Sequence, residues 1–220
     1  MLLTIVGFLF ATAATAPGRA AAGTVGSREG TDGITIVASN AGQQYCAGDE
    51  DTFRVLIDLA IRVDNKSRRI LVWPRSGSVT PISRVASTAL EAAAGKWVAK
   101  FNGHEITGPR SSPPPHHGDW YMLIKPGESR EIHWFAEIIA HRPNASTNVS
   151  GTVPAGGSYV LDATQRLWPL EEISRGAFER QRRRWVERGY RIFDTVRTPF
   201  IPFEVAARPD VGACSLPMPR

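Results

Sequence analysis

The stretch Phe53-Arg54-Val55-Leu56-Ile57-Asp58-Leu59-Ala60-Ile61-Arg62-Val63 decides the fold class of this 220-residue chain. Side chains of a β-strand point alternately to its two faces, so six apolar side chains of this segment fall on one face. The other face carries the charges of Arg54, Asp58 and Arg62. A helix would scatter the same residues around its circumference. The pattern therefore predicts a long strand of an antiparallel sheet that is buried on one face.

The N-terminus has the composition of a secretory signal. Leu2 to Ala16 is apolar or small throughout, and this run is shorter than the about 20 apolar residues of a membrane-spanning helix. The small residues of Ala11-Thr12-Ala13 and Ala20-Ala21-Ala22 fit a cleavage site. No Lys or Arg precedes the run, so a buried N-terminal strand is the alternative. We expect residues 1–22 to be a targeting segment and the mature chain to be exported, periplasmic or extracellular, without a membrane span.

The composition is that of an ordinary globular protein, with 21% charged and 42% hydrophobic residues. A net charge of +5 favours weak attraction to acidic surfaces. The basic residues are mostly spread among acidic ones, so we expect no nucleic-acid partner. The length that remains after signal cleavage suits one large domain.

The chain has two cysteines, Cys46 and Cys214. An even number of cysteines in an exported protein predicts a disulfide bond, and this bond would tie the two ends of the domain together. Two free thiols are the alternative in a cytosolic chain. The wide spacing fits neither a redox nor a zinc motif.

Short alternating segments separated by Pro and Gly turns recur along the chain. Such spacing is typical of a β-sandwich, so we predict an all-β, immunoglobulin-like antiparallel sandwich over residues 31–207. Asn40 to Asp51 is interpreted as a polar loop, and Pro126-Gly127 has the signature of a type II turn. Besides the long strand at Phe53–Val63, we expect shorter strands at Ile34–Ala38, Ile70–Trp73, Trp97–Phe101, Tyr121–Ile124, Ile132–Ile138, Tyr159–Ala163, Tyr190–Val196 and Phe200–Ala206.

Two segments depart from the strand pattern. Glu171 to Arg188 has apolar residues at helical spacing and predicts one amphipathic helix near the C-terminal end. Its arginines indicate a solvated face, with an acidic partner as the alternative. Ser83 to Ala94 is Ala-rich and fits either a short helix or an irregular strand. Residues 208–220 are expected to form a loose tail.

The turns carry a faint resemblance to a known family. The relevant segments are Asp64-Asn65-Lys66-Ser67, Gly95-Lys96-Trp97, Lys125-Pro126-Gly127-Glu128-Ser129 and Pro154-Ala155-Gly156-Gly157-Ser158-Tyr159. Together they resemble immunoglobulin-like sandwiches of bacterial exported proteins, and faintly the BsuPI-type proteinase-inhibitor domain. The similarity covers about Phe53 to Thr164. It implies a fold, because its motifs are mostly turn chemistry, and it implies no inhibitory role for any residue. The doubled Gly156-Gly157 departs from the family's pattern.

All five histidines lie between His104 and His141. A Pro-stiffened loop could present His116 and His117, with Asp119 nearby, to a metal ion. This segment supports the hypothesis of a metal-binding protein or a metal-dependent enzyme. Adjacent histidines seldom bind one ion together, so a solvated loop is the alternative.

The chain has six tryptophans, and their places favour different roles. Trp73, Trp97 and Trp134 lie on alternating segments and are predicted to be core residues. Trp120 follows the Pro/His loop and is the one expected to be accessible. An exposed aromatic face makes a carbohydrate-binding module a further alternative.

The sequence offers little for catalysis. It has no nucleophile elbow, no P-loop and no dinucleotide fingerprint, so we expect no enzyme activity and no cofactor. We favour a non-enzymatic exported module that contacts another macromolecule. The expected contact surface is the loop from Thr107 to Trp120, because Pro113-Pro114-Pro115 pre-extends its backbone. The side chains predicted to make this contact are Arg110, His116, His117 and Trp120.

Overall fold

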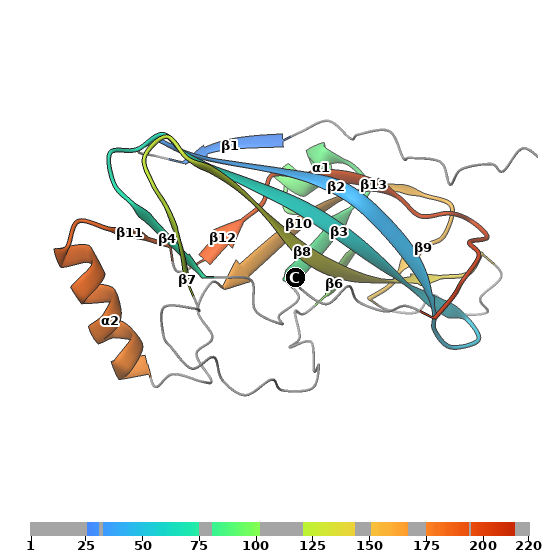
Figure 1. Cartoon of the computed structure of the whole chain (residues 1–220). Coiled ribbons are helices and arrows are strands. Elements are labelled where there is room, and N and C mark those ends of the chain that lie inside the picture. Colours follow the sequence, from blue (N-terminus) through green and yellow to red (C-terminus); the bar gives the residue numbers. More distant parts are fainter. Residues whose placement is uncertain are drawn as a thin grey trace, which may run out of the picture.

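The structure is a computed structural model that describes residues 26–30, 33–74, 81–101, 121–143, 151–166, 175–193 and 195–213. It is mostly β-structure with two short helices, so the prediction of an all-β class is confirmed (Figure 1). The elements are β1 (Gly26–Gly30), β2 (Ile34–Ala47), β3 (Thr52–Asn65), β4 (Leu71–Pro74), β5 (Ile82–Ala86), α1 (Ala89–Ala93), β6 (Ala99–Phe101), β7 (Tyr121–Ile124), β8 (Ser129–His141), β9 (Val153–Pro154), β10 (Ser158–Arg166), α2 (Arg175–Glu187), β11 (Arg191–Ile192), β12 (Thr195–Arg197) and β13 (Ile201–Glu204).

The long strand predicted from the apolar alternation is β3, and it lies at the centre of the largest sheet. The strand order is β1-β2-β3-β8-β9, and β3 pairs antiparallel with β2 and β8 along nearly its whole length. The six apolar side chains from Phe53 to Val63 are all fully buried, at 0% exposure. The prediction of a strand buried on this face is therefore confirmed.

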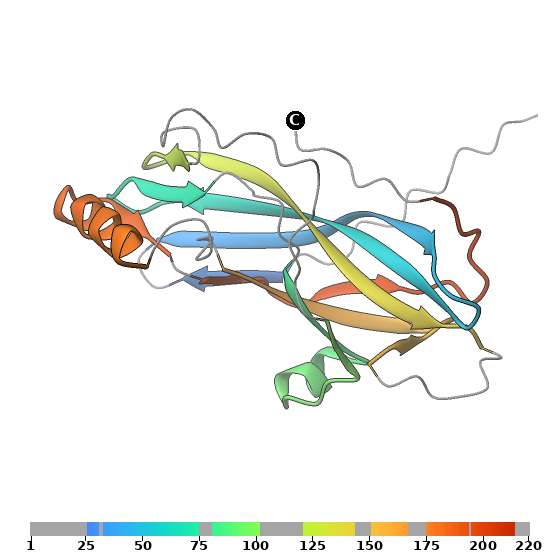
Figure 2. The same cartoon turned by 90° about the horizontal axis from the view of Figure 1, so that it is seen from below.

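Two further sheets complete the core. One has the strand order β12-β10-β5-β6, and β13 also pairs with β10. The other is small, with the order β11-β4-β7, and it lies beside α2 at one end of the molecule (Figure 1). In Figure 2, β2, β3 and β8 run along one side and β10 and β13 along the other. The inner faces of these strands contribute to one hydrophobic cluster, which includes Leu59 of β3 and Leu161 of β10.

The strand predicted at Ile34–Ala38 is β2, which is longer than expected. The loop predicted from Asn40 to Asp51 is therefore wrong as far as Ala47 and confined to residues 48–51. β2 continues to Ala47 because a bulge between Asn40 and Gly42 absorbs the break in the apolar pattern. The Asn40 side chain accepts a hydrogen bond from the Gly42 amide at 3.0 Å and so holds the bulge. β1 had no sequence signal, since Gly-Ser-Arg-Glu-Gly shows no alternation, and it pairs with the edge of β2.

The described residues contain two helices, the amphipathic one predicted near the C-terminal end and a shorter one in the Ala-rich segment. The ambiguous Ala-rich segment forms both of its alternatives, with β5 followed by α1, whose N-terminus is capped by Thr88. The predicted amphipathic helix is α2, described from Arg175 to Glu187. Its last residue is Glu187, and Gly189, which follows two positions later, has a φ of 80°, the left-handed conformation that terminates helices.

The turn at Pro126-Gly127 has the geometry that the sequence predicts. Gly127 has a φ of 82°, and the Glu128 amide donates to the Lys125 carbonyl at 3.0 Å, so the type II turn is confirmed. Asn65, at the end of β3, is 1% exposed. Its side-chain amide donates to the carbonyls of Arg69 and Ile124, both at 2.8 Å. This residue therefore joins the end of β3 to the strand that precedes the turn.

Candidate functional site

Most of the side chains that the sequence predicted as functional lie outside the described residues. These are Arg110, His116, His117, Asp119, Trp120 and Cys214. Of the histidines, His133 lies on the outer face of β8 next to Asp58, whereas His141 contacts Thr152 at 2.9 Å. In the part of the chain that the structure describes, no three metal-ligating side chains come together.

Cys46 lies at the end of β2 and is 2% exposed. The Gly212 amide donates to the Tyr45 carbonyl, and the Ala47 amide donates to the Gly212 carbonyl, both at 3.1 Å. This parallel bridge sets Gly212 beside Cys46. Residues 208–213, expected as the start of a loose tail, are thus anchored to β2 at Gly212, two positions before Cys214 in the sequence.

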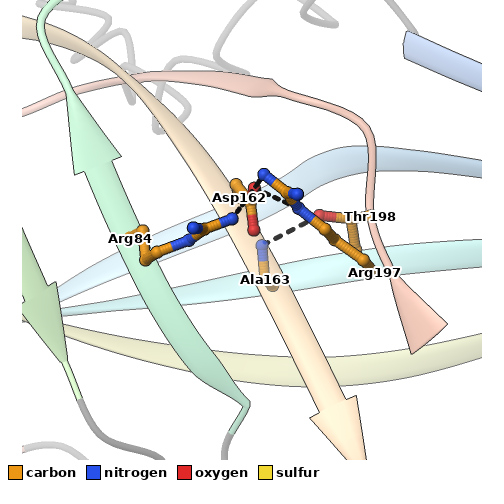
Figure 3. Close-up of polar contacts among 5 residues, drawn as sticks. All are labelled: Arg84, Asp162, Ala163, Arg197 and Thr198. Carbon is orange, nitrogen blue, oxygen red and sulfur yellow. Dashed lines mark hydrogen bonds and ion pairs between the residues drawn. The ribbon is translucent and has the colours of Figure 1, made fainter. Parts of the chain in front are cut away.

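The described residues contain a different polar cluster, centred on Asp162 of β10 (Figure 3). Asp162 lies between the core residues Leu161 and Ala163, so its side chain points to the outer face of the sheet. The Nη2 atom of Arg84 lies 2.8 Å from Asp162 Oδ2, and the Nε atom of Arg197 lies 2.5 Å from the same oxygen. Arg197 Nη2 also forms an ion pair with it. Two guanidinium groups therefore share one carboxylate oxygen.

The local backbone explains how these residues meet. Arg84 is directly opposite Asp162 on the neighbouring β5. On the other side, Arg197 is opposite Thr164 and Ile201 is opposite Leu161, so three residues, 198–200, face two residues of β10. This local bulge brings Arg197 toward Asp162.

At the bulge, Thr198 makes the hydrogen bonds to β10 that regular strand pairing would make. Its amide donates to the Ala163 carbonyl at 2.8 Å. Its hydroxyl accepts from the Ala163 amide at 3.0 Å (Figure 3). The hydroxyl stands where a backbone carbonyl would accept in a regular ladder. Pro199, which follows, has no amide hydrogen to leave unpaired.

An aromatic pair lies against the cluster. The Arg84 guanidinium carbon is 4.2 Å from the centre of the Trp97 ring, a distance typical of a cation–π contact. The Trp97 and Phe200 rings are 6.4 Å apart and tilted by 59°. The prediction of Trp97 as a core residue is wrong, because it is only half-buried, whereas Trp73 and Trp134 are buried as predicted. The chain turns between Trp97 and Ala99, so the two side chains do not share a face.

The cluster is positively charged at its surface. Asp162 is 0% exposed, whereas the side chains of Arg84 and Arg197 are 27% and 39% exposed. One carboxylate balances only one of the two guanidinium charges. Lys100, opposite Arg84 on β6, is exposed and adds a further positive charge. The face can therefore accept an anionic group, and the aromatic pair offers an apolar surface next to it.

One atom of the cluster has no hydrogen-bond partner among the described residues. This atom is Asp162 Oδ1, which is buried. A buried acceptor without a donor destabilises the folded state by about 1–3 kcal/mol. The cluster is therefore not an optimal arrangement for stability alone.

The arginine-rich helix α2 is separate from this cluster. It lies at the end of the molecule near β11 and β4 (Figure 1). Glu179 and Arg182 form an ion pair at 3.7 Å, and Trp185 is buried at 9% exposure. This arrangement fits the interpretation of a solvated helix face on a buried aromatic residue.

No protein-family model, curated protein or solved structure matches this chain. Neither described helix is long and apolar enough to cross a membrane. Function is therefore inferred from the geometry of the Asp162 cluster and from the sequence.

Proposed function

We propose that this chain is a non-enzymatic exported module that binds an acidic macromolecule through the outer face of the β10 sheet. The observation that carries this proposal is the pair of partly exposed guanidinium groups on one buried carboxylate oxygen. Arg and Trp are the residue types enriched at binding hot spots. The contact surface comprises Arg84, Trp97, Lys100, Arg197 and Phe200.

The energetics support a role in binding. Ion pairs with a buried member often contribute no net stability, because desolvation offsets the Coulomb attraction. In the Asp162 ion pairs, the unpartnered Oδ1 atom lowers the stability of the folded state further. Such an arrangement is explained if it positions two guanidinium groups for a ligand. Asp162 then acts as a positioning residue, since it fixes both arginines from beneath the surface.

The finer fold assignment belongs to the same proposal. We infer an immunoglobulin-like sandwich, supported by two sheets that share one core and are antiparallel except for the β8–β9 pair. The resemblance to the BsuPI-type domain is supported by the turn positions of Asn65, Gly127 and Gly156 alone. It is a proposal about fold, and fold alone does not assign function.

Export and the disulfide bond are also proposed together. Support comes from the buried Cys46 and from the bridge that sets Gly212 beside it. The chain needs only two more residues to reach Cys214. The contact loop predicted from Arg110, His116, His117 and Trp120 lies outside the described residues and stays a prediction, as do the metal and carbohydrate alternatives.

The binding test uses a fluorescein-labelled hexaglutamate peptide and measures its anisotropy as protein is added. The triple variant Arg84→Met, Asp162→Leu, Arg197→Met lowers the net charge by one, and so does the control Arg183→Met on α2. We expect the triple variant to weaken binding at least tenfold and the control to keep it within twofold. Equal affinities of all three proteins, or equal losses in both variants, would exclude a specific anionic contact at this face.

A further inference from the structure

A recess lies on the side of the molecule opposite the Asp162 cluster, on the outer face of the β2-β3-β8 sheet. It is a shallow depression of about 200 Å³. This volume is below the range of about 300–1,000 Å³ typical of sites for drug-sized ligands. The depression therefore fits a single side chain or a group of similar size. It is lined by Gly42, Gln43, Gln44, Leu56, Asp58 and Phe135.

The depression exists because of the β2 bulge. In the register of the sheet, Gly42, Asp58 and Phe135 form one row across three strands. The first member of this row has no side chain, so the space beside Asp58 is left open. A Cβ atom built on Gly42 would meet nothing within 4 Å. Bulges often mark functional positions, since they re-aim side chains and interrupt the regular surface.

The lining has the chemistry of a site for a cation. The Asp58 side chain is 32% exposed, and its Oδ1 atom lies 2.7 Å from His133 Nδ1. Its second oxygen has no partner among the described residues, so it can accept a charge-assisted hydrogen bond. Phe135, half-buried next to it, offers a ring for a cation–π contact.

The rest of the lining suits the aliphatic stem of a basic side chain. Leu56 is 6% exposed and forms an apolar floor. Lys and Arg bury their methylene stems on such surfaces and keep the charged group in polar surroundings. Gln44, in the next row and opposite Leu56, can accept a hydrogen bond through its amide oxygen.

The charge of the lining favours a cation over an anion. Of the six residues that line the depression, Asp58 is the only charged one, although the chain as a whole carries a charge of +5. We propose that this depression binds one Arg or Lys side chain of a protein partner. The site is independent of the Asp162 cluster and gives the module a second contact surface on its opposite side.

The probe is N-acetyl-arginine amide, added to the ¹⁵N-labelled full chain while amide chemical shifts are recorded. We expect saturable shifts at Gly42, Gln44 and Phe135. N-acetyl-citrulline amide has nearly the same shape without the charge, and it should bind at least tenfold more weakly. Methyl glucoside tests the alternative occupant, because aromatic, amide and carboxylate groups also bind sugars.

Two variants locate the binding. Gly42→Leu fills the depression, and Asp58→Asn removes its charge, so each should abolish the shifts. Glu187→Gln is the matched control, since it removes one exposed carboxylate of α2 that does not line the depression, and it should change the affinity less than threefold. The spectrum of each variant also reports whether the fold is kept, and the Asp162-cluster triple variant should bind the arginine probe like wild type.

Three outcomes would overturn the proposal. Equal binding of the citrulline probe would mean that charge is not recognised. Stronger binding of methyl glucoside at the same amides would make the depression a sugar site. Absence of saturable shifts with both the arginine and the corresponding lysine probe, in folded wild-type protein, would exclude a basic side chain as the occupant.

Discussion

Replacing the charged members of the Asp162 cluster by apolar residues should leave the fold as stable as before. At an effective dielectric constant of about 20, each guanidinium attracts the carboxylate by about 4 kcal/mol. Desolvation takes up several kcal/mol for each buried ion, and the two guanidinium groups repel each other. The unpartnered Oδ1 adds a further penalty. We therefore expect the free energy of unfolding of the triple variant Arg84→Met, Asp162→Leu, Arg197→Met to lie within about 2 kcal/mol of wild type.

Partial replacements should behave differently. The double variant Arg84→Met, Arg197→Met leaves a fully buried carboxylate without a counter-charge and should destabilise the fold by about 3–5 kcal/mol. The single variant Asp162→Leu should lose less, about 1–3 kcal/mol, because both arginines are partly exposed and can hydrate. Adding Asp162→Leu to the double variant should thus restore stability.

Urea denaturation at pH 7, followed by far-ultraviolet circular dichroism, measures these differences. Circular dichroism is preferred to fluorescence because Arg84 contacts Trp97, and the substitution alters the emission of that ring. A triple variant as unstable as the double variant would refute the reasoning. The cluster would then be required for folding, and its geometry would no longer indicate a binding role.

Three further predictions concern the first sheet and the ends of the chain. Leu59→Ala removes a side chain that is 0% exposed and should lower the free energy of unfolding by about 2–5 kcal/mol. Leu56→Ala should lower it by only about 1–2 kcal/mol, since the space opens to solvent in the depression; equal losses in chemical denaturation would contradict this. The hydrogen bond to Asp58 raises the pKa of His133 above its usual value of 6.5. The contribution of the protonated His133 to the free energy of unfolding is therefore complete below pH 6.5 and is lost as the pH rises through the raised pKa. In the variant His133→Gln, the free energy of unfolding should no longer decline over this pH range. Thiol titration of denatured, unreduced protein should find no free thiol, because we expect a bond between Cys46 and Cys214; its reduction should destabilise the fold by about 3–5 kcal/mol, and two titratable thiols would reject the bond.

The buried face of the first sheet was predictable because the pattern that indicates it lies within one continuous segment of the sequence. The alternation from Phe53 to Val63 repeats with the period of a strand, and the turn at Pro126-Gly127 depends on two adjacent residues. β2 was predicted too short for the same reason. Its bulge is stabilised by Asn40 and by pairing with β3, and local composition does not reveal such pairing.

The candidate site was not predictable from local patterns. Asp162 meets Arg84 across 78 positions and Arg197 across 35 positions of the sequence. A charged residue between Leu161 and Ala163 is expected, in the common case, on the exposed face of a strand, and local composition does not indicate that its side chain is buried. The available signal was that Asp162 alternates with buried residues while arginines occupy outward positions of the neighbouring strands. Recognising it requires the strand order, which alternation alone does not give.

Trp97 shows a related limit. Its spacing from Ala99 and Phe101 predicts a shared face, but the strand begins only at Ala99, and the chain before it turns to lay the ring on Arg84. Alternation holds only within one strand. The position of the strand's first residue therefore decided whether this tryptophan joined the core or the candidate site.

Site-specific photocrosslinking in the native cell tests the central claim most directly. Val98, next to Trp97, is 44% exposed and can carry p-benzoylphenylalanine without disturbing the core; Val186 on α2 is 51% exposed and serves as the control position. The account predicts a discrete adduct from position 98 in the exported fraction, its loss when Arg84→Met, Asp162→Leu and Arg197→Met are added, and no such adduct from position 186. An adduct from position 98 that survives the three substitutions, or adducts from position 186 alone, would contradict it.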